Sequence, residues 1–155
     1  MSLLQTKLAR IALESRFVVS LLRVIVPPLD RFLLTVSCGW LNTALQPVLL
    51  LRTVGAKSGL PRKTATLCMP LGNDLVVVGS NWGQERNPAW VHNLRANPGA
   101  RVVFRGYAGP VSAQELAGAE RDEVWQTLIE FNPLYERYQA GTSRQIPVIR
   151  LRRPG

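Results

Sequence analysis

Short apolar stretches alternate with turn residues along most of the chain, and their periods predict a mixture of strands and helices. Apolar and β-branched runs bounded by glycine, proline or asparagine are typical of strands. We therefore expect strands over residues 47–54, 62–71 and 75–80, two strands or one bent strand over 100–116, and a last strand over 146–151. The turn signal at residues 72–74 predicts that the second and third of these form a hairpin.

The N-terminal apolar segment predicts two helices rather than a membrane span. They should cover residues 5–26 and 29–37, separated by Pro27-Pro28, because proline ends one helix and can begin another. Arginines interrupt the segment at three positions: Arg16, Arg23 and Arg31. No uncharged run approaches the roughly eighteen residues that a span needs, and no small-residue cleavage signal follows. Arginines among apolar residues suit a helix in the interfacial plane of a bilayer, and packing on the domain or on a second subunit is the alternative.

Two more helices are predicted further along the chain. Asn87 is placed to cap a helix that has Pro88 at its first position, and Trp90 and Leu94, four residues apart, should point inward from it. Residues 114–131 have the composition of an amphipathic helix. About six short strands with interspersed helices and no βαβ alternation predict an α+β fold. A small barrel in one domain is favoured over a doubly wound sheet.

The composition predicts a hydrophobic core and a positive electrostatic field around the protein. A chain of 155 residues with 46% hydrophobic content suits one globular domain. Nineteen basic and ten acidic residues give a formal net charge of +9, and the excess lies in residues 1–112, because residues 113–155 hold six residues of each sign. Such a field favours phosphate-bearing ligands, nucleic acid or an anionic membrane surface, without choosing among them.

Side chains that commonly carry catalysis are scarce. Cys38 and Cys68 lie in apolar surroundings without CxxC spacing, which predicts buried free thiols and a reducing, cytoplasmic location. His92 is the only histidine, and no serine or cysteine with a carboxylate is convincingly placed to form a triad with it. No metal site is expected, since clustered ligands are missing. Such a protein either only binds or takes its chemistry from a cofactor.

The stretch "LLLRTVGAKSGLPRKT", residues 49–64, ends an apolar strand in a small basic turn. A Walker A loop would need glycines where Leu51 and Ala56 stand, and a dinucleotide fingerprint would need another spacing and a following helix. The turn nevertheless suits an anion, because glycines let backbone N–H groups face a ligand while the lysine, arginine and serine add charge and a donor. The residues concerned are Gly55, Lys57, Ser58, Gly59 and Arg62. A solvated hairpin loop is the alternative.

The stretch "VVVGSNWGQERNPAWVHNLRANP", residues 76–98, leads from a strand through a small polar turn into a helix. Ser80 and the backbone of this turn could hydrogen-bond the edge of a flat heterocycle. Core packing is the alternative for Trp82 and Trp90, and the sequence favours it for Trp90 over Trp82.

These two stretches, followed by "YERYQAGTSRQIPVIRL" at residues 135–151, resemble in this order the deazaflavin-dependent nitroreductase family, the F420-dependent oxidoreductases of the split β-barrel type. The resemblance covers about residues 47–105 and 131–151. It implies a split β-barrel similar to FMN-binding folds over residues 41–155, preceded by an N-terminal helical segment over 1–40. It also implies a homodimer that binds coenzyme F420, a deazaflavin with a phosphate and an oligoglutamate tail.

The family's motifs imply roles for particular residues. Its G-x-K-S-G-x-x-R turn holds the phosphate side of the cofactor, which points to Gly55, Lys57, Ser58, Gly59 and Arg62. Its serine-containing turn before the N-P-x-W helix lies against the deazaflavin ring, which points to Ser80, Asn81, Trp82 and Gly83. Asn87 and Trp90 of the N-P-x-W motif are further candidates for cofactor binding. Its late Tyr-x-x-Tyr-Gln element lines the substrate side, so Tyr135 and Tyr138 are the candidate catalytic residues. Some members carry lysine where Asn81 stands here, which leaves extra tail contacts open.

The implied reaction is hydride transfer from the reduced deazaflavin to a hydrophobic acceptor such as a quinone, with nitroaromatics as further substrates. An FMN-dependent reductase on the same barrel and a non-enzymatic deazaflavin-binding protein are the alternatives. No nucleic-acid partner is expected, because the aromatic-basic interleaving typical of base stacking is missing. The apolar N-terminus is similar in character to that of a membrane-associated branch of the family, so a peripheral position on the inner face of the cell membrane is compatible with it.

Overall fold

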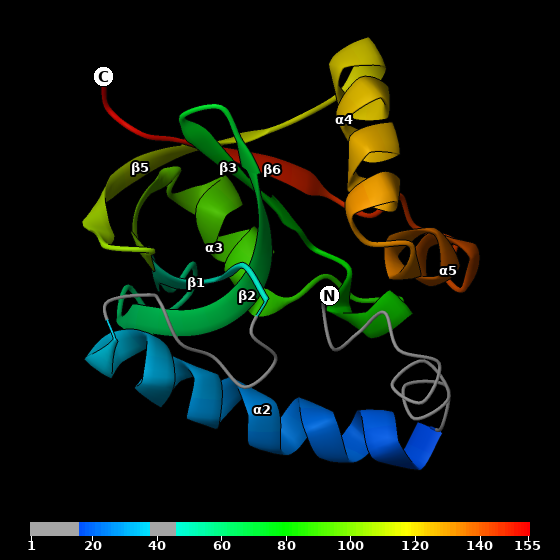
Figure 1. Ribbon diagram of the computed structural model, residues 1–155, viewed down its shortest axis with the longest axis horizontal. Helices are drawn as coiled ribbons and strands as arrows, with labels where there is room; N and C mark the ends of the chain where they lie inside the picture. The colour runs from blue at the N-terminus through cyan, green and yellow to red at the C-terminus, as the bar shows by residue number, and fades with distance from the viewer. Residues whose placement is uncertain (1–15, 38–45) are drawn as a thin grey trace.

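The runs predicted as strands close into an antiparallel barrel in the computed structural model, which describes residues 16–37 and 46–155 (Figure 1). In these residues there are six strands, β1 (Val48–Val54), β2 (Pro61–Leu71), β3 (Asp74–Val78), β4 (Gly99–Phe104), β5 (Tyr107–Glu115) and β6 (Val148–Arg152). Their order around the barrel is β1-β2-β3-β6-β5-β4, and β4 closes the barrel by pairing with β1. The predicted hairpin at residues 72–74 is confirmed, and residues 100–116 form two strands rather than one.

Helices cover the barrel on two sides and close one of its ends. They are α2 (Arg16–Val36), α3 (Ala89–Ala96), α4 (Gly118–Phe131) and α5 (Leu134–Ala140), with a short 3-10 turn η2 (Asn81–Gly83) before α3. Figure 1 shows α2 running along one side of the barrel and the α4–α5 pair on another, with α3 set into the ring of strands. The predicted α+β split-barrel class is confirmed.

The interior of the barrel is a single apolar cluster to which α3 contributes one face. Trp90, Val91 and Leu94 of α3 pack there against barrel residues that alternate along each strand, such as Leu49 and Leu51 of β1. The inward direction predicted for Trp90 and Leu94 is confirmed, since they are 5% and 3% exposed. Because α3 is anchored in this core, the chain segments that enter and leave the helix are held in place where they join it.

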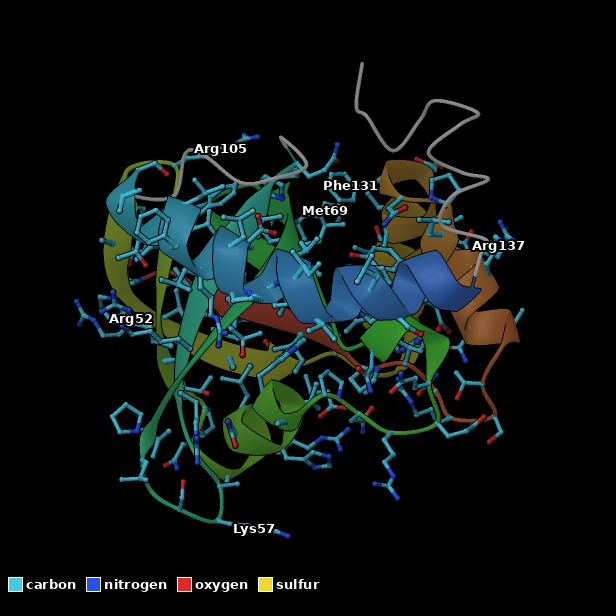
Figure 2. All side chains as sticks on the ribbon, turned by 90° about the horizontal axis from the view of Figure 1, so that it is seen from below. Arg52, Lys57, Met69, Arg105, Phe131 and Arg137 are labelled. Carbon is cyan, nitrogen blue, oxygen red and sulfur yellow. The ribbon has the colours of Figure 1, made fainter. Side chains whose placement is uncertain are left out.

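Two further clusters attach the outer helices. Leu34 of α2 packs on Val48, Leu50 and Val103 of the barrel wall. Met69 of β2 and Val76 of β3 face the α4–α5 pair, and Figure 2 shows Met69 near Phe131 at the end of α4. Residues of β3 are therefore buried on both faces, alternately in the barrel and under the helices.

The prediction of two N-terminal helices separated by prolines was wrong for the described part. One helix, α2, runs from Arg16 to Val36 with Pro27 and Pro28 inside it, and residues 1–15 lie outside the described residues. Proline has a backbone φ near the helical value, so a helix can continue through it if the carbonyl groups that lose a partner are solvated. Val24 and Pro28 are exposed, and Leu34 anchors the far half of the helix on the barrel.

Cys68 is a free thiol buried in the barrel interior, as predicted, and Cys38 lies outside the described residues. Burial raises the pKa of the Cys68 thiol to about 12, because the apolar interior disfavours the thiolate. Cys68 is therefore a core residue with no chemistry of its own near neutral pH.

Candidate functional site

The turn between β1 and β2 is a compact glycine-bounded loop. The Gly55 N–H donates to the Leu60 carbonyl at 2.8 Å, and the Gly59 N–H donates to the Gly55 carbonyl at 2.8 Å. Gly59 has φ +67°, a conformation that favours glycine. A Cβ on Gly55 would collide with Ser58 Oγ and stand 3.3 Å from the Leu60 carbonyl oxygen. The shape of this turn therefore favours glycine at both positions, through the backbone φ at Gly59 and through close neighbours at Gly55.

The tip of the turn offers donors without acceptors. Within residues 16–37 and 46–155, the backbone N–H groups of Lys57 and Ser58 have no protein acceptor. Lys57 extends outward from the tip (Figure 2), and the Arg62 guanidinium approaches Ser58 Oγ at 3.4 Å. Two backbone donors flanked by a lysine and an arginine form a concavity suited to an anion.

Asn93 of α3 holds this turn in place through hydrogen bonds of its side-chain amide. It is 7% exposed, its Oδ1 accepts from the Ala56 N–H at 2.9 Å, and its Nδ2 donates to Thr53 Oγ1 at 3.1 Å. The amide therefore bridges the helix to the last residues of β1 and to the first residue after Gly55. Sequence analysis did not single out Asn93. Its only signal was a polar residue on the buried face of a helix, three positions after Trp90.

A cleft of about 920 Å³ lies between this turn and α3. Its lining comes from the turn, the start of β2 and one side of the helix: Gly55, Ala56, Lys57, Ser58, Arg62, Lys63, Thr64, Ala89, Trp90, His92, Asn93, Arg95 and Ala96. None of these lining residues is acidic. Arg95 is already paired with Glu115, through two hydrogen bonds of 2.8 and 2.7 Å. Lys57, Arg62 and Lys63 are the cations left to a ligand.

The turn after β3 has an uncommon backbone. Asn81, Trp82 and Gly83 have φ values of +45°, +58° and +77°, three consecutive left-handed residues. Asparagine and glycine tolerate this region, whereas an aromatic residue is a genuine outlier in it. The Asn81 amide supports the turn by donating to Gln84 Oε1 at 3.1 Å and to the Arg86 carbonyl at 2.8 Å. Strain held in place by its surroundings is typical of functional sites.

Arg144 holds this turn. Its guanidinium donates to the carbonyls of Gly79 (3.1 Å), Ser80 (2.9 Å) and Gln84 (2.9 Å), and to Asn87 Oδ1 (2.7 Å). The pKa of Arg144 is lowered from its usual range, because the turn partly removes the guanidinium from water. Five donors in a planar fork are what allow one side chain to serve four acceptors. Sequence analysis included Arg144 in a matching segment but gave it no role.

The capping role predicted for Asn87 was wrong. Pro88 occupies the N-cap position of α3, and no side chain caps the helix there. The Asn87 side chain turns away from the helix because its Oδ1 accepts the short hydrogen bond from Arg144. Asn87 therefore belongs to the bonding of the turn rather than to the helix end.

A second tie joins the same two segments. Both carboxylate oxygens of Glu85 accept hydrogen bonds of 3.0 Å from Ser143, one from the backbone N–H and one from the hydroxyl. These donors hold the pKa of Glu85 below its usual range, the backbone N–H having the largest effect. The turn is therefore clamped by two adjacent residues, Ser143 and Arg144, that lie about sixty positions further along the chain.

The two candidate tyrosines occupy different environments. Tyr138 is half-buried on α5, with its ring edge-on to that of Trp82 at 6.5 Å between centroids. A Cβ on Gly83 would stand 3.2 Å from Tyr138 Cα, so the turn and α5 are in close contact. Tyr135 is 4% exposed and packs on Trp125 at 6.3 Å, and burial raises its pKa. Only Tyr138 lies beside the turn that contains Ser80.

The predicted residues therefore form two groups that α3 links. Gly55, Lys57, Ser58, Arg62 and Trp90 line the cleft, with Gly59 completing the turn. The second group comprises Ser80, Asn81, Trp82 and Gly83 with Tyr138 beside them, and none of these lines the cleft. Asn93 of α3 bonds the first group, while Val91 of α3 fills the space against Gly79 at the root of the second.

Comparisons with known proteins identify the family of this chain. The family model for F420H(2)-dependent quinone reductases matches residues 36–152. The F420H(2)-dependent quinone reductase Rv1261c of Mycobacterium tuberculosis (strain ATCC 25618 / H37Rv) is 38% identical over 110 residues, which are 69% of this chain and 74% of that protein.

Two solved structures share both fold and sequence. A structure titled F420-H2 dependent reductase (FDR-A) superimposes with a TM-score of 0.63 at 35% identity, over 68% of this chain and 93% of that one. A structure titled as a domain-swapped dimer gives a TM-score of 0.63 at 34% identity, over 70% and 82%.

The barrel and its similarity to the FDR-A structure identify a deazaflavin-dependent oxidoreductase of the split-barrel class. Within this class, the chain belongs to the F420H(2)-dependent quinone reductase family. The resemblance found in the sequence, the enzyme class and coenzyme F420 as the cofactor are confirmed by this membership.

Proposed function

We propose that the cleft between the β1–β2 turn and α3 binds the phosphate side of reduced coenzyme F420, and that the enzyme reduces a quinone. The observation that carries this is the composition of the cleft. Its lining includes Lys57, Arg62 and Lys63, contains no acid, and is joined by two backbone N–H groups without a protein acceptor in the described part of the chain. This donor set fits a phosphate, which prefers backbone N–H groups and arginine forks.

The reaction requires few side chains of the protein. The reduced deazaflavin, when bound, supplies a hydride, and a quinone that accepts this hydride and one proton becomes a hydroquinone. The chain has to orient the two partners and keep competing acceptors out. We assign the orientation of the ring to the turn of Ser80 to Gly83, because Arg144 and Glu85 hold its uncommon backbone in one conformation.

Of the two tyrosines, we place Tyr138 on the acceptor side. It is half-buried beside Trp82, so an apolar acceptor could contact both rings, and its hydroxyl or a water could deliver the proton. Tyr135 would shape this region from within the core, because it is almost fully buried against Trp125.

The outward face of α2 supports a membrane-surface position for the enzyme. Large apolar side chains are exposed there at helical spacing: Leu21, Val24, Ile25, Leu29, Phe32 and Val36. In the described residues no helix is both long and apolar enough to cross a membrane. We propose that this face rests on lipid, where a hydrophobic quinone is dissolved. Phe32→Glu should release the protein from vesicles, whereas Asn73→Glu, which adds the same charge in an exposed turn, should not.

A homodimer belongs to the same proposal, supported by the solved relative titled as a domain-swapped dimer. Sedimentation at several protein concentrations, with and without detergent, would separate self-association from lipid binding through α2. A monomer at all concentrations would contradict the dimer and leave the cofactor site as proposed.

The primary test is a fluorescence titration of F420 into protein from a host that lacks it, with FMN in parallel. We expect micromolar or tighter F420 binding and weaker FMN binding. Lys57→Ala/Arg62→Ala should weaken F420 binding about a hundredfold, because two charge-assisted contacts are lost. The matched control is Arg105→Ala/Arg152→Ala, which removes the same charge at exposed positions outside the cleft.

The two steps of the proposal separate in one further assay. Oxidation of reduced F420 by a soluble quinone should depend on enzyme and stop in the Lys57→Ala/Arg62→Ala variant. Tight binding without oxidation by any quinone would identify a cofactor carrier instead. Preference for FMN, or equal loss in the control variant, would contradict the assignment of the cleft.

A further inference from the structure

The chain just before β6 makes contacts in two directions. We call residues 143–146 the linking segment. On one side, Ser143 and the Arg144 side chain bond the turn that we place at the deazaflavin ring and the residues after it. On the other side, the backbone of the segment is bonded by side chains of α4 and α5. The linking segment therefore joins the turn to the helix that carries Tyr138.

Gln139 of α5 uses both ends of its side-chain amide to hold the linking segment. Its Nε2 donates to the Arg144 carbonyl at 2.7 Å, and its Oε1 accepts from the Ile146 N–H at 2.9 Å. The donor and the acceptor belong to one planar group, so both bonds form together only in a narrow range of positions of the segment relative to α5. The half-buried amide thus sets that relative position.

Arg121 of α4 bonds the same segment from the interior of the protein. It is 6% exposed, and its Nη2 donates to the Ile146 carbonyl at 2.9 Å. Its guanidinium carbon lies 4.9 Å from the centre of the Trp125 ring. Both backbone groups of Ile146 are therefore bonded by side chains, one of them a buried cation. Burying a charge costs free energy, and features of this kind are expected where a position matters for function.

These bonds fix the spacing between the ring side and the acceptor side of the proposed site. Tyr138 directly precedes Gln139 on α5, and its ring is edge-on to that of Trp82 in the turn. A shift of the linking segment relative to α5 would therefore move the turn relative to Tyr138. A misplacement of about 1 Å between reacting partners can slow a reaction about a hundredfold.

We propose that Gln139 is a positioning residue for hydride transfer, which holds the turn at the deazaflavin ring in a fixed place relative to the acceptor side on α5. This inference rests on the function proposed above. Gln139 does not line the cleft, and Arg144 would keep its own bonds to the turn when Gln139 is replaced. Loss of the Gln139 amide should therefore leave cofactor binding intact and slow the chemical step.

The test follows a single turnover of protein loaded with reduced F420 after mixing with a water-soluble benzoquinone, with the rate expressed per bound cofactor. Gln139→Met keeps the length of the side chain and removes both bonds, while Arg121 still limits the movement. We expect F420 affinity within about twofold of the wild type, a rate at saturating quinone about tenfold lower, and a half-saturating quinone concentration within about threefold. The matched control Gln126→Met, at an exposed position of α4, should keep the wild-type rate.

Gln139→Glu gives a readout that a mere loss of stability would not produce. A protonated carboxyl group donates and accepts as the amide does, whereas a carboxylate only accepts and would face the Arg144 carbonyl oxygen. The rate of this variant should therefore be low at neutral pH and recover as its carboxyl group is protonated. Dividing by the wild-type rate at each pH removes the contribution of Glu85, which is bonded to the same segment, and the arginines stay charged throughout.

The outcomes separate this inference from the function on which it rests. Failure of the wild type to bind F420 or to reduce the quinone would contradict the proposed function itself. A wild-type rate in Gln139→Met would overturn the positioning role alone, as would a Gln139→Glu rate that stays constant relative to the wild type in acid. Equal losses of F420 affinity and rate in Gln139→Met would assign the residue to the integrity of the whole cofactor site and likewise overturn it. If Gln139→Met does not fold, the pH profile of Gln139→Glu decides.

Discussion

Replacing Arg144 by methionine should destabilise the protein and loosen the turn that we place at the deazaflavin ring. The substitution keeps a long side chain but removes all four hydrogen bonds of 2.7 to 3.1 Å to the turn. A hydrogen bond to a charged group contributes about 1.5–3 kcal/mol when its partner would otherwise be buried. Arg144 is half-buried, so water can replace the guanidinium at some of these acceptors.

We count about half of the acceptors as left unsatisfied, which gives a loss of about 3 kcal/mol in the free energy of unfolding. For a chain of this size, that lowers the melting temperature by about 6–12 °C. Arg144→Lys should lose about half as much, because an ammonium group keeps the charge but cannot reach four acceptors in one plane. Arg152→Met, at an exposed position, should change the free energy by less than about 0.5 kcal/mol.

Urea unfolding measures the global effect, and hydrogen exchange of the amides in residues 80–87 measures the local one. Exchange there should accelerate more than in the barrel strands, and F420 affinity should fall with it. If Arg144→Met unfolds at the same urea concentration as the wild type and residues 80–87 exchange no faster, the anchoring role is refuted. An equal loss of stability in Arg152→Met would refute it as well.

Three further predictions address other contacts of the site. Gly83→Ala should destabilise the protein by about 1–3 kcal/mol and impair turnover, because φ is +77° and the new Cβ would press on Tyr138. The control is Gly72→Ala, at φ +60° with open space around it, which should cost only the free energy of placing a non-glycine residue in a left-handed backbone conformation. Asn93→Asp should weaken F420 binding about tenfold at low salt and less at high salt, since it puts a negative charge in the cleft lining. The pKa of Glu115 is lowered by its hydrogen bonds to an arginine of α3, so this stabilisation is present at neutral pH and is lost as the pH falls through the folded-state pKa. The unfolding free energy of the wild type should therefore exceed that of Glu115→Gln by less than about 1 kcal/mol at pH 7, and the difference should shrink as the pH is lowered below the usual range of a glutamate. A difference that stays constant in acid would contradict the ion pair.

The turn between β1 and β2 could be read from the sequence because its requirements are local. Gly59 is favoured by its φ of +67° and Gly55 by the close approach of Ser58 and Leu60, all within a few residues, and the cations follow in the same stretch. The strands were predictable for the same reason, since alternation along a strand reports the two faces directly. Their limits moved by one or two residues, as with β6 at Val148–Arg152 instead of 146–151.

Contacts between distant segments could not be predicted in the same way. Arg144 reaches acceptors 57 to 65 positions away, and Asn93 reaches Ala56 over 37 positions, so neither role has a local signature. The wrong assignment of Asn87 as a helix cap arose in this way, because asparagine followed by proline satisfies the local rule for a helix start. In the structure, the Asn87 side chain instead accepts a hydrogen bond from Arg144, a charged donor that is distant in the sequence. The continuous helix through Pro27-Pro28 is a similar case, in which packing on the barrel overrides a local signal.

Helix α3 explains how a protein with so few reactive side chains can direct a reaction. One face of the helix is fixed in the barrel core through Trp90, Val91 and Leu94, so its position does not depend on a ligand. Asn93 transmits that position to the β1–β2 turn, and the short segment before the helix is clamped by Arg144. The phosphate end and the ring end of the proposed cofactor site are therefore both held in position by one rigid element, α3. Orientation of this kind, rather than acid–base chemistry, is the contribution that a hydride-transferring cofactor requires from its protein.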